Sequence, residues 1–141
     1  MNPRTVSVGI LLMQDSNVLL VKHTGKAKHK TGVYGFPAGR VEKGETLVQA
    51  AARELEEETG LIAEEKDLIE FSGNYFEAEI VMKYGPERFA FTVFLCRKFA
   101  GDLNSSPENL PEWISIADLD SFETLPNIKD AIESARRFLN G

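Results

Sequence analysis

Residues 39–61 have the sequence GRVEKGETLVQAAARELEEETGL, which carries the strongest structural signals in the chain. Thr46 is suited to cap a helix, and Gln49 three residues later completes a capping box. The interior that follows is rich in Ala, Leu and Glu, which all favour helix. Gly60 is a typical residue for ending a helix. The stretch therefore predicts a glycine-containing loop followed by a helix over 47–58.

Three carboxylates of this helix share one face, because Glu54, Glu57 and Glu58 stand at positions i, i+3 and i+4. Like charges at this spacing destabilise a helix by roughly 0.2–0.5 kcal/mol, and the C-terminal end of a helix is already negative. Helix propensity does not explain these residues, whereas a bound divalent cation such as Mg²⁺ or Mn²⁺ would explain them. The alternative is a solvated acidic face with Lys43 and Arg53 as counter-ions.

Outside this stretch, alternating apolar residues predict strands, and an amphipathic stripe near the C-terminus predicts a second helix. Strands flanked by two helices, without regular βαβ alternation, indicate an α+β sandwich. No repeat or long linker divides the chain, so residues 1–141 are expected to form a single domain. The expected strands are 5–13, 18–21, 68–84, 89–99 and 112–116, with 33–37 extended, 38–45 and 101–111 as loops, an antiparallel turn around 85–86 and a helix over 127–139.

The composition excludes several classes of protein. The 141 residues are 43% hydrophobic and 27% charged, which is ordinary for a globular domain. No apolar run approaches the roughly 20 residues of a membrane-spanning helix, and the first residues lack the features of a secretory signal. The net charge is −6, and the residues between 42 and 65 account for all of it, so the basic surface of a nucleic-acid binder is absent. With Cys96 as the one cysteine, no disulfide is expected, and a cytoplasmic location is the expectation.

The stretch 39–61 resembles the Nudix box, whose pattern is G-x5-E-x7-R-E-U-x-E-E-x-G-U with U aliphatic. All nine specified positions match without a gap. The resemblance implies the Nudix α/β/α sandwich, with a mixed β-sheet, the loop–helix–loop of the box and a C-terminal helix. It also implies a hydrolase of nucleoside diphosphates linked to another group X. The chemistry is consistent, because a diphosphate needs cations to neutralise its oxygens and to acidify the attacking water.

The resemblance also assigns roles to residues of the box. Glu57 and Glu58 would be metal ligands together with the Gly39 carbonyl, and Mg²⁺ is the implied cofactor, with Mn²⁺ as the alternative. Glu54 would be a ligand or the general base that activates water. Arg53 would orient Glu54 and neutralise part of the acidic cluster, while Glu45 would be a structural partner at the junction of loop and helix.

Two segments outside the box are further candidates. Family members often add a glutamate from a loop before a tryptophan-containing strand, and Glu108 is preferred here over Glu112, which lies too close to the strand. Glu108 is thus a candidate metal ligand and a rival of Glu54 as general base. The basic loop 22–30, with Lys22 and His23 at its start, would hold outer phosphates; the alternative is a solvated surface loop.

The substrate is less well defined. The residues downstream of the box lack the proline typical of ADP-ribose hydrolases and the tyrosine typical of dinucleoside polyphosphate hydrolases. The chain therefore looks most like the MutT type, which converts nucleoside triphosphates to monophosphate and pyrophosphate. In that type an asparagine amide at the position of Asn127 reads a purine edge, which makes 8-oxo-dGTP a candidate. Asn127 is otherwise expected as a helix N-cap, and Phe36, Tyr34 and Phe76 either stack on a base or fill the core.

Three functions remain open at this point. The first is a Mg²⁺-dependent nucleoside triphosphate pyrophosphohydrolase, acting on a small nucleotide as a monomer or homodimer. The second is the same chemistry on ADP-ribose or another nucleotide sugar, which Ala38 favours because MutT-type proteins usually have glycine there. The third is a non-catalytic nucleotide-sensing module, against which the retained Arg53 and box glutamates argue.

Overall fold

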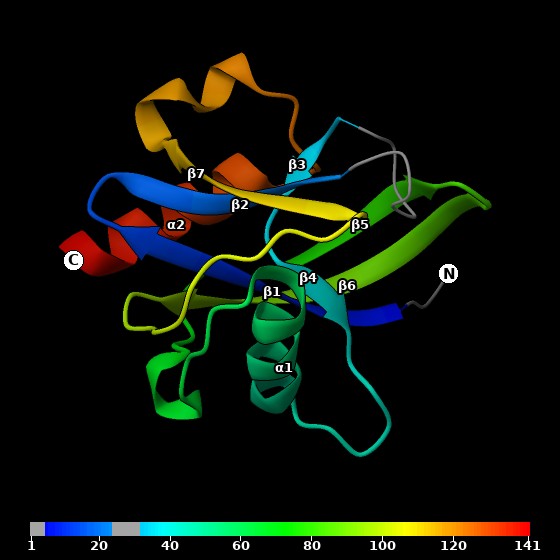
Figure 1. Cartoon of the computed structure of the whole chain (residues 1–141), viewed down its shortest axis with the longest axis horizontal. Coiled ribbons are helices and arrows are strands. Elements are labelled where there is room, and N and C mark those ends of the chain that lie inside the picture. Colours follow the sequence, from blue (N-terminus) through cyan, green and yellow to red (C-terminus); the bar gives the residue numbers. More distant parts are fainter. Residues whose placement is uncertain (1–4, 24–31) are drawn as a thin grey trace.

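The computed structural model describes residues 5–23 and 32–141, which form strands, two helices and two short 3-10 turns. In chain order the elements are β1 (Thr5–Gln14), β2 (Asn17–His23), β3 (Tyr34–Gly35), β4 (Ala38–Arg40), α1 (Leu47–Thr59), η1 (Glu65–Asp67), β5 (Tyr75–Met82), β6 (Gly85–Cys96), β7 (Asn109–Ser115), η2 (Ile116–Ser121) and α2 (Ile128–Asn140). Figure 1 shows their arrangement.

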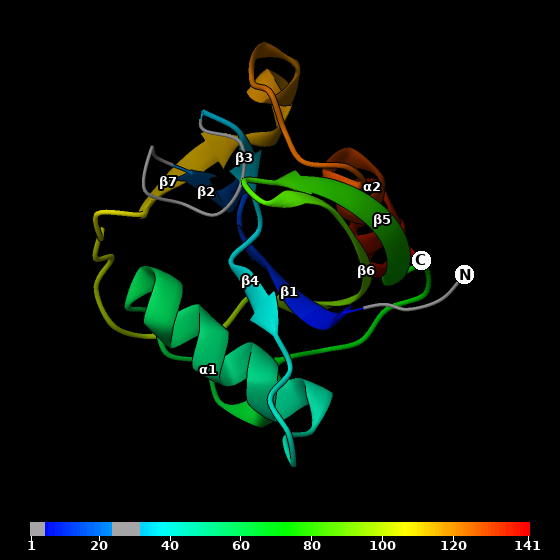
Figure 2. The same cartoon turned by 90° about the vertical axis from the view of Figure 1, so that its right-hand side faces the viewer.

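The strands form one mixed sheet in the order β3-β2-β1-β6-β5, with β4 pairing along β1 and β7 along β2. The central pair, β1 and β6, is parallel, with Val8 opposite Thr92. The neighbouring pairs are antiparallel, and the β5–β6 hairpin forms the curved end of the sheet (Figure 2). The expectation of an α+β fold with a mixed sheet and a C-terminal helix is confirmed.

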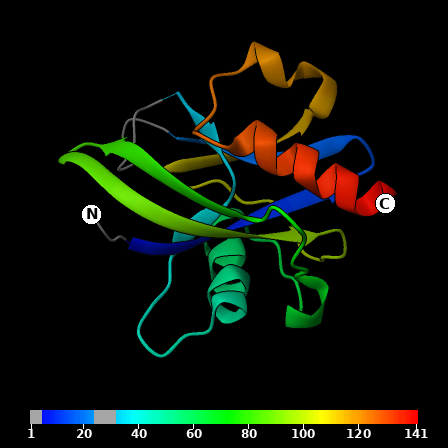
Figure 3. The same ribbon diagram turned by 180° about the vertical axis from the view of Figure 1, so that it is seen from behind.

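Strand β1 is buried on both of its faces, which explains its continuous apolar sequence. Successive side chains of a strand point to opposite faces. Val8, Ile10 and Leu12 belong to the apolar cluster that contains α1, whereas Leu11 and Met13 belong to the cluster that contains α2. The two helices therefore lie on opposite sides of the sheet (Figures 2 and 3).

Helix α1 begins and ends as the sequence predicts. The Thr46 hydroxyl accepts a hydrogen bond from the Gln49 backbone N–H at 3.1 Å, and the Gln49 side chain accepts one from the Thr46 N–H at 2.9 Å. Gly60 takes the left-handed conformation with φ of 83° and closes the helix. The capping box fixes where the helix starts, and therefore which residues its acidic face presents.

Some strand boundaries differ from the expectation. The predicted strand 68–84 is a strand only from Tyr75, because Gly73 at φ of 88° makes a turn before it. The buried Leu68 and Phe71 produce the apolar pattern upstream without being in a strand. The hairpin turn lies at 83–84, two residues earlier than expected, since Met82 pairs with Gly85.

Two of the predicted loops are also partly strand. Ala38–Arg40 forms β4 along β1, and β7 starts at Asn109, so the second loop is shorter than predicted. Both short strands are held by pairing with distant partners, which local sequence does not reveal. The pairing of β4 matters for the site because it places the start of the box against the sheet.

Candidate active site

A pocket of about 680 Å³ lies between α1, β4 and the β5–β6 hairpin. The acidic part of its lining consists of glutamates from α1, from the loop before α1 and from the loop before β7. The aromatic and aliphatic part comes from β5, β6, the segment before α2 and Phe36 between β3 and β4. The acidic wall contains Glu42, Glu54, Glu57, Glu58 and Glu108; the apolar wall contains Phe36, Phe76, Ile80, Met82, Phe89, Phe91, Val93 and Leu125; and Ser7, Gly9, Gly39 and Asn127 lie among them.

The acidic wall is positioned by the packing of α1. Ala51 and Leu55 are fully buried against the sheet, so the opposite side of the helix is turned outward. Glu58 is held in addition by β4, because its Oε1 accepts a hydrogen bond from the Ala38 backbone N–H at 2.9 Å. The sheet and the helix therefore fix this carboxylate from both sides.

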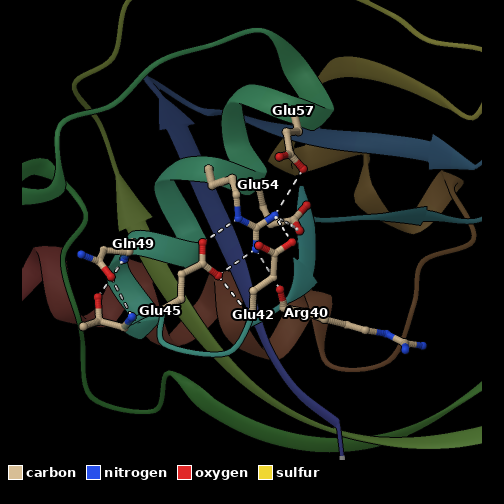
Figure 4. A network of polar contacts seen from close by, with 8 residues as sticks. Arg40, Glu42, Glu45, Gln49, Glu54 and Glu57 are labelled. Carbon is tan, nitrogen blue, oxygen red and sulfur yellow. Dashed lines mark hydrogen bonds and ion pairs between the residues drawn. The ribbon is translucent and has the colours of Figure 1, made fainter.

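Arg53 is the centre of a network that joins the loop of the box to its helix (Figure 4). Its guanidinium donates two hydrogen bonds to Glu45, from Nε at 2.6 Å and from Nη2 at 2.9 Å. It also donates to Glu54 Oε2 at 2.8 Å and to Glu57 Oε1 at 3.3 Å. A further hydrogen bond to the Arg40 carbonyl at 3.0 Å ties it to β4. The two-pronged bond to Glu45 fixes the plane of the guanidinium, which in turn orients Glu54.

The carboxyl groups of the site have different pKa values for physical reasons. The hydrogen bond from Arg53 lowers the pKa of Glu45 to about 2. Burial raises the pKa of Glu54, although Arg53 opposes the shift. Burial also raises the pKa of Glu58 to about 8, and repulsion from Glu54, Glu57 and Glu108 adds to the effect. A cluster of this kind favours either protonation or a bound cation.

Gly39 is required by the close approach of Glu54. A Cβ atom at position 39 would coincide with the Glu54 carboxyl group. The main chain of β4 and this carboxylate are therefore packed directly against each other. Any residue other than glycine would force one of them to move.

The donor chemistry of the pocket fits a hard divalent cation. The described residues contain no preassembled group of three Asp, Glu, His or Cys side chains at metal-binding distances. Mg²⁺ does not require one, because it is usually bound through one or two carboxylates, water and substrate phosphates. Five carboxylates and the closely packed Gly39 line the same pocket, and all their donors are oxygens. This donor set suits Mg²⁺ or Mn²⁺.

The raised pKa of Glu58 predicts a pH-dependent stability of the metal-free protein. An acid whose pKa rises on folding contributes stability that is lost as the pH rises. For Glu58 the loss falls between its ordinary value of 4.5 and about 8. In EDTA, the melting temperature is expected to fall across this range and to fall less in Glu58→Gln. Mg²⁺ is expected to raise the melting temperature more at pH 8 than at pH 6. Equal pH profiles for the two proteins would contradict the assignment.

The structure separates the two loop glutamates. Glu108 lines the pocket and raises the pKa of Glu58 by its charge. Both Glu112 carboxylate oxygens accept from the Tyr34 hydroxyl at 3.3 Å, and Glu112 does not line the pocket. The geometry thus favours Glu108, the residue preferred from the sequence.

The other predicted substrate contacts fall into two groups. Phe36 and Asn127 line the pocket, whereas Lys22 does not; its ammonium lies 6.0 Å from the centre of the Tyr34 ring. Asn127 occupies the N-cap position of α2 with φ of 71°, but its side chain makes no capping hydrogen bond, so the capping role is wrong in this respect. The expectations for the His23 side chain and for residues 24–30 lie outside the described residues.

Sequence reasoning missed most of the apolar wall. Phe89, Phe91, Ile80 and Met82 alternate along the hairpin strands, so their pattern predicted a buried sheet face and not a pocket. Phe76 was one of the aromatic residues expected either to stack on a base or to fill the core, and it lines the pocket. Phe91 was not singled out, because the sequence does not reveal the curvature of the hairpin.

Together, the fold and the site define an α+β protein with an acidic wall facing an aromatic wall across one pocket. A family model described as the NUDIX domain matches residues 3–138. The chain belongs to the Nudix hydrolase family.

Individual relatives show the range of the resemblance. The chain is 35% identical over 114 residues to the NAD-capped RNA hydrolase NudC of Photobacterium profundum, covering 78% of this chain and 37% of that protein. It is 24% identical over 132 residues to the 8-oxo-dGTP diphosphatase of Escherichia coli, covering 94% of this chain and 95% of that protein. The MutT Nudix hydrolase structure from Burkholderia pseudomallei matches with a TM-score of 0.78 and 25% identity, covering 92% of this chain and 96% of that one. The chain spans only 30% to 44% of the length of the first three curated relatives.

Proposed function

We propose that this chain hydrolyses a nucleoside triphosphate to the monophosphate and pyrophosphate in a Mg²⁺-dependent reaction. The observation that carries the proposal is the pocket itself. Its acidic wall suits a metal-neutralised phosphate chain, and its aromatic wall suits a flat base. Residues 1–141 would act as one domain, on a small nucleotide and in the cytoplasm. Among the described residues, no helix is long and apolar enough to cross a membrane.

The box residues would divide the work of the reaction. Glu57, Glu58 and the Gly39 carbonyl, with Glu54 or Glu108, would hold the cation. The bound cation would neutralise phosphate oxygens and lower the pKa of water. Arg53 binds Glu54 Oε2 and keeps that carboxylate in one orientation.

The hydrolytic step needs a group that accepts a proton from water. The oxygen of that water forms a bond to the α- or the β-phosphorus, and the bond from that phosphorus to the oxygen bridging the two breaks. The bridging oxygen leaves with pyrophosphate after attack at the α-phosphorus, and with the monophosphate after attack at the β-phosphorus. Glu54 is the better placed acceptor, because Arg53 orients it and burial raises its pKa, which makes it a stronger base. Glu108 is the alternative, and its exposed position gives it no comparable support.

Asn127 would contact the base. Its side chain lines the pocket and makes no capping bond at the start of α2. An amide offers a donor and an acceptor, which suits a purine edge, including that of an oxidised guanine. The match to the E. coli 8-oxo-dGTP diphosphatase over almost the full length of both chains supports the same substrate class.

A second candidate is hydrolysis of a dinucleotide pyrophosphate such as the NAD group. The matches to proteins named NAD-capped RNA hydrolase NudC, at 35% and 32% identity, favour it. Under this alternative a capped RNA end would also be a substrate. The chain covers less than half of those proteins, so the resemblance supports the shared chemistry more than the shared substrate.

A substrate panel tests the proposal. The protein would be incubated with Mg²⁺ or with EDTA, and phosphate and pyrophosphate release would be followed. The panel would contain ordinary and oxidised NTPs and dNTPs, ADP-ribose, NADH, diadenosine polyphosphates and an NAD-capped RNA. We expect metal-dependent pyrophosphate release from a triphosphate. Cleavage confined to ADP-ribose, NADH or the capped RNA would show that the substrate is not a nucleoside triphosphate. If folded protein releases no product from any member of the panel, a nucleotide sensor would be favoured.

A further inference from the structure

The Ser7 hydroxyl is a buried polar group without a hydrogen-bond partner. Ser7 lies in β1 and is only 2% exposed. Among the buried side-chain oxygen and nitrogen atoms of residues 5–23 and 32–141, its Oγ is the one that has no partner. Neither the acidic nor the apolar wall of the pocket supplies a hydrogen-bond partner for this hydroxyl.

Ser7 belongs to the face of β1 that borders the pocket. Val8 packs into the α1 cluster, so the alternation of the strand turns Ser7 and Gly9 to the other face. Both residues line the pocket. In the sheet, Ser7 is opposite Phe91 on β6 and opposite Arg40 on β4. The hydroxyl thus sits at the floor of the pocket, beside its aromatic wall.

An orphaned hydroxyl is costly in a folded protein, because burial removes its hydrogen bonds to water. Alanine at this position would fill a similar space without that cost. Gly9, two residues away on the same face, shows that small residues are accommodated here. A ligand that bonds to Oγ would offset the cost, and native structures contain few such groups without a reason.

We propose that the Ser7 hydroxyl hydrogen-bonds to a polar edge of the nucleobase and is a specificity-determining residue of this pocket. The proposal rests on the proposed function, since it requires a nucleotide in the pocket. We assign the Ser7 contact to the base of the nucleotide because Phe91 is the partner of Ser7 on β6, and Phe89 and Val93 flank Phe91 on that strand. The phosphates are expected at the other wall, where the glutamates lie.

The test compares Ser7→Ala with the wild type on two ligands. The first is the nucleoside triphosphate that the wild type hydrolyses best, and the second is inorganic tripolyphosphate, which has no base, as an inhibitor. We expect the KM of Ser7→Ala to rise about five- to tenfold for the nucleotide, the size of one lost hydrogen bond. Its kcat and the inhibition constant of tripolyphosphate should stay within twofold. An unchanged KM, or equal shifts for both ligands, would overturn the proposal.

Two controls separate binding from folding. Ser115→Ala removes a strand hydroxyl that does not line the pocket and should behave as wild type. Without nucleotide, the melting temperature of Ser7→Ala should equal or exceed that of the wild type, because an unpaired hydroxyl is removed. A fall of several degrees would show that Oγ has a structural partner and would overturn the inference. If the wild type binds no nucleotide at all, the proposed function fails first, and this inference fails with it.

Discussion

The Glu57→Gln variant is expected to keep its fold and to lose hydrolysis by about 10²- to 10³-fold in kcat, the size of effect seen when one electrostatic contact of a reaction site is removed. The amide has nearly the same shape as the carboxylate but lacks its charge. Glu57 is 58% exposed in its side chain, and its bond to Arg53 is a long one of 3.3 Å, so little stability depends on it. Initial rates at saturating Mg²⁺, with melting temperature as the folding check, would measure the effect.

The matched control is Glu56→Gln. Glu56 is the preceding residue of the same helix, is exposed and does not line the pocket. Both variants change the net charge equally, so a general electrostatic effect would lower both rates alike. Equal rates for Glu57→Gln and the wild type would exclude Glu57 from the metal site. Folded protein that hydrolyses no substrate, in either the wild-type or the variant form, would favour the nucleotide-sensing module instead.

Gly39→Ala is expected to lower both activity and stability strongly. The added Cβ would coincide with the Glu54 carboxyl group, so the carboxylate or β4 must move. Misplacing a catalytic group by about 1 Å can cost 10²-fold in rate, and overpacking costs about 1–3 kcal/mol of stability. We therefore expect a loss of about 10²-fold in kcat with reduced stability, measured by initial rates and by urea unfolding.

A double-mutant cycle isolates this contact. In a Glu54→Ala background the carboxyl group is absent, so adding Gly39→Ala should cost little further stability. Gly9→Ala is the steric control, since its Cβ would lie 3.7 Å from Phe36 and Val93, which is ordinary contact. If Gly39→Ala lowers the free energy of unfolding equally with and without the Glu54 carboxyl group, the strain lies elsewhere, for example in the backbone of β4.

The loop–helix–loop of residues 39–61 was predictable because its signals are local. Thr46, Gln49 and Gly60 act on neighbours within a few residues, and the box motif fixes the spacing of the glutamates. The preference for Glu108 over Glu112 also came from sequence position, and the Tyr34 contact of Glu112 now gives it a physical reason. The family resemblance supplied the chemical roles, which rest on the spacing of few residues.

The remaining features depend on contacts between distant segments. The turn of the β5–β6 hairpin and the strand pairing of β4 came out differently from the expectation, since pairing partners decide them. Phe91 and Ser7 reach the pocket because β6 runs parallel to β1 in a fixed register. Lys22, by contrast, was predicted to contact phosphates because of its charge, and the structure places its ammonium near the Tyr34 ring.

The sequence by itself determined the class of the fold and the acidic face of α1, because local propensity and a fixed spacing encode them. The metal ligands are what the family resemblance implies, and they stay a prediction. Only the tertiary structure decided what faces those glutamates. Packing of β1 on both faces buried Ser7 without a partner. Burial raised the pKa of Glu58, although the hydrogen bond from Ala38 of β4 opposes the shift. Hydrogen-bond satisfaction and desolvation depend on three-dimensional neighbours, which no pattern of residues along the chain specifies.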